Sequence, residues 1–162
     1  MTDAEAPDDD SPQRRHLRRL DHVWVHQPIY LITVCTCERR ELLLGSAMAG
    51  ATTDCLADTR ARHAWQVGRY VIMADHLHFL CTPEADASDL SAFVGGFKQA
   101  STRAAWRLGH SGRLWQREFH DHLLRSASAY TEKDEYVRMN PVRRGLCADA
   151  DEWPHGGVLD VI

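Results

Sequence analysis

Two strand-like segments separated by only two residues constrain the fold of this chain more than any other feature. Residues 65–73 (WQVGRYVIM) and residues 76–82 (HLHFLCT) are rich in the β-branched and aromatic side chains that favour strands. Ala74 and Asp75 lie between them, and aspartate favours tight turns because its side chain bonds the nearby backbone. The sequence therefore predicts an antiparallel hairpin.

Local patterns predict the first strand, the first helix and the fourth strand. Residues 29–37 (IYLITVCTC) are β-branched and roughly alternating, so they are a predicted strand. Residues 119–124 are predicted to form a further short strand. Residues 47–63 are rich in alanine and are predicted to form a helix.

Two later helices have clearer boundaries. Ser88 is a suitable N-cap, and the apolar residues over positions 90–108 recur at helical spacing. The last helix begins near Ser128 and must stop at Asn140, because Pro141 disfavours the helical conformation of the residue before it.

The resulting order is β-α-β-β-α-β followed by one more helix. This order is typical of the ferredoxin-like α+β fold, a split β-α-β arrangement with an antiparallel sheet and helices on one face. The extra C-terminal helix contains Tyr136. Residues 1–20 combine acidic and basic runs with few apolar groups, which predicts a mobile tail. Residues 21–162 are then a single domain.

Composition excludes several classes of protein. The chain has 162 residues, of which 44% are hydrophobic and 26% charged, which suits one domain. No apolar segment approaches the roughly 18 residues that a membrane span requires, and the polar N-terminus lacks the apolar region of a secretory signal. Five cysteines cannot all pair internally, so we expect reduced thiols and a cytoplasmic location. Cys35 and Cys37 have no second pair to complete a zinc site and are expected to be small buried hydrophobes.

Charge is distributed unevenly along the chain, whose net charge is −4. Residues 95–145 contain ten Lys and Arg against five Asp and Glu, a balance of +5, so the remainder carries −9. These basic residues are interspersed with Trp106, Trp115 and Phe119. Cations beside aromatic faces suit single-stranded nucleic acid, whose phosphates are anionic and whose bases stack. A solvated helix face is the alternative that charge alone favours.

The hairpin carries the first chemical signal, His76-Leu77-His78. Residues two apart on a strand share a face, so both imidazoles project together. Two neutral imidazoles side by side are good ligands for a divalent metal ion. The alternative is a pair of polar strand residues that are hydrogen-bonded to their neighbours.

The second signal lies on the last helix. Tyr136 and Asn140 are four residues apart, so they lie on one helix face about one turn apart. The apolar contacts of this helix are expected from Tyr130 and Val137, with Tyr136 rotated towards Lys133 and Asn140. Taken alone, Tyr136 is better explained as an ordinary surface aromatic.

These segments resemble a known family. Residues 71–80 (VIMADHLHFL) resemble the His-hydrophobe-His motif of the HUH single-tyrosine transposases. Residues 114–146, which begin LWQREFHDHLLR and end EYVRMNPVRRGL, resemble the REP-associated tyrosine transposases of that superfamily. The resemblance covers about residues 29–154. Ala74 stands where the family usually has proline before the Asp-His pair, which changes the stiffness of the turn and removes no ligand.

The resemblance implies a function and a set of site residues. Tyr136 would attack a phosphodiester in single-stranded DNA, leaving a 5′-phosphotyrosine and a free 3′-OH. His76 and His78 would hold Mg²⁺ or Mn²⁺, with Asn140 as a third ligand. The substrate would be a repetitive extragenic palindrome folded as a hairpin, and the protein would be a bacterial, nucleoid-associated monomer or homodimer.

Further residues are candidates for DNA contacts and for supporting roles. The candidate DNA contacts are basic or aromatic: Lys98, Arg103, Arg113, Trp115, Arg117 and Arg143. Solvated charge, surface ion pairs and, for the tryptophan, core packing are the alternatives. Asp121 and His122 are candidates for groups that orient a ligand or the tyrosine, with a structural pair as the alternative. His120 is expected to alternate away from both.

Two rival functions use the same residues differently. A catalytically silent module would keep the fold and the basic surface and bind the hairpin DNA without cleaving it. A zinc protein would use His76, His78 and Cys81, although Cys81 is expected to face away from both histidines on a regular strand.

Overall fold

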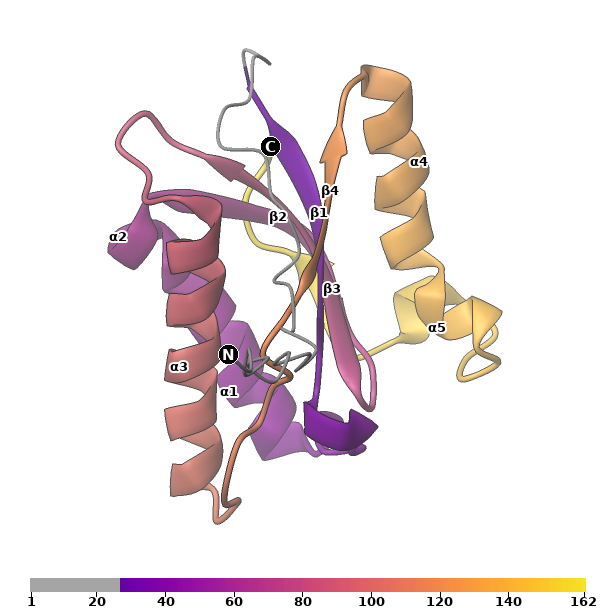
Figure 1. Cartoon of the computed structure of the whole chain (residues 1–162). Coiled ribbons are helices and arrows are strands. Elements are labelled where there is room, and N and C mark those ends of the chain that lie inside the picture. The colour runs from indigo at the N-terminus through magenta and orange to yellow at the C-terminus, as the bar shows by residue number, and fades with distance from the viewer. Residues whose placement is uncertain (1–26) are drawn as a thin grey trace, which may run out of the picture.

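The computed structural model describes residues 27–162, so the tail predicted over residues 1–20 lies outside the described residues. Its centre is a five-stranded sheet in the order β4-β1-β3-β2-β5, and all neighbouring strands are antiparallel (Figure 1). This sheet and its helices confirm the predicted α+β fold. The strands are β1 (Ile29–Cys35), β2 (Trp65–Ile72), β3 (His76–Pro83), β4 (His120–Leu124) and β5 (Gly156–Val158).

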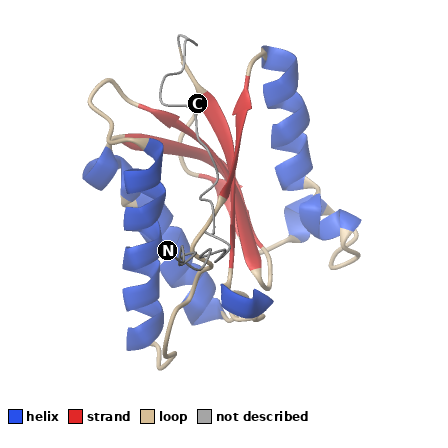
Figure 2. Cartoon of the chain, viewed as in Figure 1, coloured by secondary structure: helices blue, strands red, loops and turns tan. Residues whose placement is uncertain are grey.

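Helices cover both faces of the sheet. Helices α1 and α3 lie on one face, and α4 lies on the other, as the separation of blue helices and red strands in Figure 2 shows. No helix among the described residues is both long and apolar enough to cross a membrane. The helices are α1 (Ser46–Ala57), α2 (Thr59–His63), α3 (Leu90–Arg107), α4 (Ala127–Arg138) and α5 (Asn140–Arg143), with 3₁₀ turns η1 (Cys37–Arg39) and η2 (Ala150–Glu152).

The face under α1 and α3 holds the main hydrophobic core. Leu77 and Phe79 of β3 are fully buried there against Phe93 and Phe97 of α3. The ring centroids of Phe79 and Phe97 are 6.0 Å apart in an edge-to-face arrangement, which aromatic pairs favour. This core fixes the position of β3, the central strand of the sheet.

The face under α4 holds a smaller apolar cluster. Leu31, Leu80 and Leu124 of the sheet pack with Val137 of α4. Because side chains alternate along a strand, the residues of β3 on this face are the even-numbered ones. His76 and His78 therefore share one face, as the strand pattern predicted, and that face is the one covered by α4.

The structure adds elements that the sequence patterns did not predict. The predicted helix over residues 47–63 is two helices, which end where Ala64 adopts a left-handed conformation with φ of 56°. Strand β5 was not predicted, because Gly156 and Gly157 give no hydrophobic alternation. A Cβ on Gly156 would lie 3.1 Å from the Tyr70 carbonyl oxygen, so glycine allows β5 to approach β2 closely.

Helix boundaries also differ slightly from the predictions. The side chain of Asp89, not Ser88, caps α3 by accepting a hydrogen bond from the Ala92 amide. Helix α4 ends at Arg138, and Pro141 lies in the first turn of a separate short helix, α5. Proline is tolerated in a first turn because the missing N–H has no helical partner there.

Candidate active site

The two histidines of the hairpin lie side by side on the central strand. His76 and His78 are 3% and 7% exposed, and their ring centroids are 4.9 Å apart. The fully buried neighbours Leu77 and Phe79 anchor the strand from its other face. The backbone beneath the two imidazoles is thus fixed by the main core.

A hydrogen bond orients each imidazole. The Nδ1 atom of His76 lies 2.6 Å from Oδ1 of Asp75, and the Nδ1 atom of His78 lies 2.7 Å from Oγ1 of Thr33. Thr33 is the residue of β1 directly opposite His78. With both Nδ1 atoms engaged, Nε2 is the ring nitrogen that each histidine has left for a ligand bond.

The surroundings of both rings favour neutral imidazole. Burial, together with the smaller effects of the nearby charges of His76, Arg144 and Arg39, lowers the pKa of His78 from 6.5 to about 3. Burial also lowers the pKa of His76, although the hydrogen bond and charge of Asp75 oppose this shift. Neutral imidazole is the form that binds metal ions, so both rings are ready ligands at neutral pH.

Tyr136 faces this histidine pair from α4. Its ring centroid lies 5.6 Å from that of His78 in an edge-to-face arrangement. Two cations flank the ring, with Cζ of Arg143 at 5.2 Å and Nζ of Lys133 at 5.7 Å from its centroid. A half-buried tyrosine is thus held between neutral imidazoles and positive charge.

Ion pairs hold α4 against the sheet and against the 3₁₀ turn η2. Nε of Arg69 on β2 lies 2.8 Å from Oδ1 of Asp134, and the Arg138 guanidinium lies 2.9 Å from Asp151. Val137, next to Tyr136 in sequence, is fully buried in the apolar cluster under α4. These contacts place the tyrosine helix beside the histidines of the same chain.

Asn140 supplies a polar atom without a partner. The residue begins α5 and is 4% exposed, and its buried Oδ1 has no hydrogen-bond partner among the described residues. A buried acceptor left unpaired is costly, and an amide oxygen is a suitable ligand for a hard divalent cation. His76, His78 and Asn140 therefore fit the donor set expected for Mg²⁺ or Mn²⁺.

The zinc alternative receives no support from the described part of the chain. Cys81 is fully buried in the main core, on the face opposite His76 and His78. No cluster of three His, Cys, Asp or Glu side chains able to hold a metal ion occurs within residues 27–162. A third ligand for the histidine pair would thus come from another residue type, such as the amide of Asn140.

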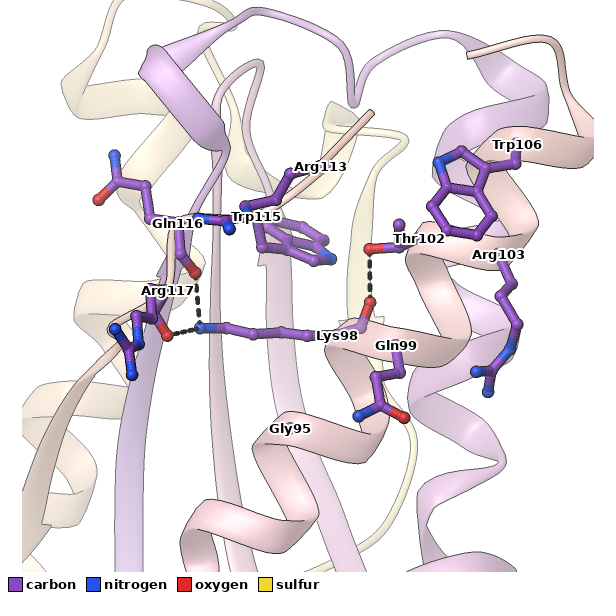
Figure 3. A pocket seen from close by; sticks show the side chains of 10 residues that line it. All are labelled: Gly95, Lys98, Gln99, Thr102, Arg103, Trp106, Arg113, Trp115, Gln116 and Arg117. Atoms are coloured by element: carbon purple, nitrogen blue, oxygen red, sulfur yellow. Dashed lines mark hydrogen bonds between the residues drawn. The ribbon is translucent and has the colours of Figure 1, made fainter. Parts of the chain in front are cut away.

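The other predicted DNA contacts lie away from Tyr136, on the α3 side of the molecule. They line a groove of about 720 Å³ between α3 and the segment before β4 (Figure 3). Arg103, Arg113 and Arg117 are exposed there, and Trp106 is 53% exposed. Only Arg143 of the predicted contacts lies beside the tyrosine. Several of the basic and aromatic residues of this segment thus line one groove, which is separate from the histidine pair.

Two residues predicted to contact DNA have structural partners in this groove. The Lys98 ammonium donates to the carbonyls of Gln116, Arg117 and Glu118 at 3.0–3.1 Å, two of which are drawn in Figure 3. These bonds give Lys98 a structural role, because the ammonium holds the segment before β4 against α3. Trp115 is only 2% exposed and donates from Nε1 to Oγ of Ser101. Core packing, not base stacking, is therefore the role of its indole.

The predicted supporting role of Asp121 is also corrected. Asp121 pairs across the sheet with Ile32, which lies in the main core, so its side chain is on the face away from the histidines. His120 pairs with Thr33 and His122 with Leu31, and both therefore share the α4 face. The expectation that His120 alternates away from His122 was wrong, because residues two apart share a face.

Sequence patterns missed three neighbours of the histidine pair. Thr33 and Arg39 are far from His76 in sequence and meet the site only through the pairing of β1 with β3. Arg144 adjoins the predicted contact Arg143, and its charge acts on both histidines. The pair of adjacent arginines was a visible signal for Arg144, whereas nothing in the sequence indicates the other two.

Comparisons with known proteins identify relatives of this chain. The chain is 28% identical over 91 residues to the REP-associated tyrosine transposase of Escherichia coli (strain K12), which is 56% of this chain and 52% of that protein. The chain thus spans about half the length of this relative. It is 22% identical to an uncharacterized protein of Haemophilus influenzae (strain ATCC 51907 / DSM 11121 / KW20 / Rd), over 80% of this chain and 88% of that one.

A solved structure shares the fold. A REP-associated tyrosine transposase bound to a REP hairpin superposes with a TM-score of 0.73 at 20% identity, over 86% of this chain and 82% of that chain. The family model described as "Transposase IS200 like" matches residues 24–139, a range that includes His76, His78 and Tyr136. The chain therefore belongs to the IS200-like transposase family.

Proposed function

We propose that this protein is a metal-dependent transesterase that cleaves and rejoins single-stranded DNA through a phosphotyrosine. The observation that carries the proposal is the packing of Tyr136 against His78. Asn140, whose buried Oδ1 has no hydrogen-bond partner among the described residues, follows Tyr136 by four positions in the sequence. A nucleophile and three ligand atoms are the parts that such a reaction needs. Membership of the IS200-like transposase family supports the same reaction class.

His76, His78 and Asn140 would hold the divalent ion, Mg²⁺ or Mn²⁺. When bound, such an ion offsets the negative charge that develops on the phosphate and orients the phosphorus for in-line attack. Two imidazoles and an amide are neutral ligands, so they leave the charge of the ion uncompensated. The donor set thus favours strong activation of the phosphate.

Tyr136 would be the nucleophile. Its hydroxyl oxygen forms a bond to phosphorus as the bond from phosphorus to the 3′ oxygen breaks. The phenolic proton is released, and the departing 3′ oxygen takes up a proton to give a free 3′-OH. Because a phosphotyrosine ester is comparable in energy to the bond it replaces, a 3′-OH can attack it and rejoin strands without ATP. Lys133, Arg143 and Arg144 are placed to attract the DNA phosphates around the tyrosine.

The groove under α3 would bind the remaining DNA. Arg103, Arg113 and Arg117 would contact phosphates, and Trp106 would stack on a base. The substrate we propose is a repetitive extragenic palindrome folded as a hairpin, since the similar solved structure holds a REP hairpin. The protein would act as a monomer or homodimer in the bacterial cytoplasm, associated with the nucleoid.

A covalent-adduct assay tests the proposal. Labelled single-stranded hairpin DNA from the flanks of the gene is incubated with the protein and Mn²⁺ or Mg²⁺, then denatured and separated by electrophoresis. We expect an adduct that requires the metal, vanishes in Tyr136→Phe and persists in Tyr130→Phe, a matched substitution on the same helix. Tight hairpin binding without any adduct under either ion would contradict the enzyme and support the silent binding module.

A further inference from the structure

The carboxylate of Asp75 lies between His76 and an arginine that the proposed reaction does not use. Its Oδ1 lies 2.6 Å from Nδ1 of His76, and its Oδ2 lies 2.7 Å from Nε of Arg39. The same guanidinium donates from Nη1 to Sγ of Cys35 at 2.6 Å, and Cys35 is the residue of β1 directly opposite His76. Arg39 therefore connects β1 with the turn that precedes His76.

The hydrogen-bond chemistry of this arrangement fixes the form of the His76 ring. A carboxylate can only accept hydrogen bonds, and a guanidinium can only donate them. Nδ1 of His76 must therefore carry the hydrogen of the short contact with Asp75. In a neutral imidazole this leaves the lone pair on Nε2, the atom that a metal ligand requires.

Backbone contacts hold Asp75 in place. Its carbonyl accepts hydrogen bonds from the Thr36 amide at 2.9 Å and from the Thr36 hydroxyl at 3.1 Å. The preceding carbonyl, that of Ala74, accepts from the Leu43 amide at 3.1 Å. Thr36 and Leu43 are both fully buried, so the turn between β2 and β3 is anchored to the core. The carboxylate is presented to the ring from a rigid support.

Arg39 reaches this carboxylate from a strained turn. Glu38 and Arg39 have φ values of 57° and 56°, a left-handed conformation that is unfavourable for a residue with a side chain. Neither residue is glycine, which would adopt this conformation freely. Strain of this kind persists where the surrounding contacts enforce it, and the contacts here are those of the Arg39 guanidinium with Asp75 and Cys35.

We propose that Asp75 and Arg39 are positioning residues that direct Nε2 of His76 towards the divalent ion, an inference that rests on the proposed metal-dependent function. Asp75 orients the imidazole, and Arg39 orients Asp75. The hydroxyl of Thr33 orients the imidazole of His78 in a similar way. Asp75 and Arg39 thus support a proposed metal ligand from outside, through the imidazole of His76.

Metal affinity of the full-length protein tests this proposal without any cleavage assay. Free Mn²⁺ is measured by electron paramagnetic resonance during a titration of each variant. We expect Asp75→Ala to weaken binding about 10–100-fold, the usual effect of removing a partner of a metal-binding histidine. Arg39→Gly should weaken it roughly 10-fold, the lower end of that range. Wild-type affinity in both variants would overturn the proposal.

Two matched variants separate positioning from structural effects. Glu38→Gly relieves the same kind of backbone strain next to Arg39 but keeps the guanidinium, so Mn²⁺ affinity should stay unchanged. Arg60→Met breaks a comparable exposed ion pair, in which a guanidinium nitrogen of Arg60 lies 2.8 Å from Glu84, and should also leave the affinity unchanged. An equal loss of affinity in these controls would indicate general destabilisation and would overturn the positioning role.

A spectroscopic readout distinguishes failure of this inference from failure of the proposed function. Long-range ¹H–¹⁵N NMR of the metal-free protein reports which ring nitrogen of His76 carries the hydrogen. We expect Nδ1–H in the wild type and the appearance of Nε2–H in Asp75→Ala. If the wild type binds no Mn²⁺ but shows this change, the metal-dependent function fails while the orienting contact stands. The same tautomer in both proteins would overturn the inference.

Discussion

The face of the sheet under α1 and α3 and the face under α4 are lined by different kinds of side chain. On the first, β3 presents Leu77 and Phe79, which are fully buried among aromatic rings. On the second, the same strand presents His76 and His78, whose hydrogen bonds lead to polar partners. Because neighbouring residues of one strand serve the two faces, the strand that is most firmly held in the core also carries the proposed ligands. Rigidity of the site thus derives from packing on the opposite side.

Separate substitutions of two neighbouring residues on β3 test this comparison most sharply. Phe79→Ala should lower the free energy of unfolding by about 3–5 kcal/mol, because it leaves a cavity in the main core. His78→Gln should cost only about 1 kcal/mol, the net worth of a typical hydrogen bond, yet abolish the DNA adduct. Urea denaturation of both variants measures the difference. Equal destabilisation by both substitutions would contradict the division of tasks between the faces.

The α4 face should also make the metal-free protein sensitive to acid. His78 has a pKa of about 3 in the folded protein, against 6.5 in the unfolded chain. Between these two pH values the imidazole binds a proton in the unfolded chain and stays neutral in the folded protein. The stability contributed by neutral His78 is therefore complete above pH 6.5 and is lost as the pH falls from there towards 3. Unfolding measured with a chelator present should show a steeper loss below pH 6.5 in the wild type than in His78→Gln. Parallel curves would contradict the burial of a neutral imidazole.

The groove on the α3 side contains Lys98, which has a structural role, and Arg103, whose side chain is exposed. Lys98→Met should lower the free energy of unfolding by about 1–2 kcal/mol, because three carbonyls lose a charged donor. Arg103→Met, an exposed position in the same groove, should change it by less than about 0.5 kcal/mol while weakening DNA binding. Thermal unfolding and a hairpin-binding titration distinguish the two. A reversed order of destabilisation would sink the assignment of Lys98.

The smallest effect is expected at the exposed end of α3. Trp106 is held by a hydrogen bond from Nε1 to the Gly112 carbonyl at 2.8 Å, which presents a fixed indole face in the groove. Trp106→Ala should weaken binding of single-stranded DNA by about 1 kcal/mol, roughly fivefold in Kd, through the loss of one stacked base. Leu108→Ala, 44% exposed at the end of the same helix, is the matched control and should leave Kd unchanged. Equal Kd values for Trp106→Ala and wild type would remove the stacking role.

Sequence patterns predicted the parts of the fold that depend on local periodicity. The hairpin that presents His76 and His78, and the long apolar helix α3, were predicted because alternation and helical spacing are visible in the residues themselves. Strand β5 could not be predicted, since its glycines pair with β2 through backbone alone. The same reason applies to the site. Thr33 reaches His78 only through strand register, a long-range feature that no local pattern carries.

The errors in predicted roles share a different cause. Lys98 and Trp115 are residue types that often contact DNA. In the fold, the Lys98 ammonium donates to backbone carbonyls and the Trp115 indole donates to Ser101. Residue type alone does not tell whether a side chain already has a partner inside the fold. For Asp121, the strand was predicted, but the face of each residue followed only once its pairing with Ile32 was known.

Mapping the residue that carries the DNA tests the central claim most directly. After the cleavage reaction with Mn²⁺, the adduct is digested with nuclease and trypsin and analysed by mass spectrometry. Trypsin cuts after Lys133 and Arg138, so the peptide Asp134–Arg138 contains Tyr136 as its only tyrosine. We expect the added nucleotide phosphate on this peptide, which would establish the α4 face as the reactive one. A phosphate attached to Tyr30, Tyr70 or Tyr130, or a metal-independent adduct, would contradict the account.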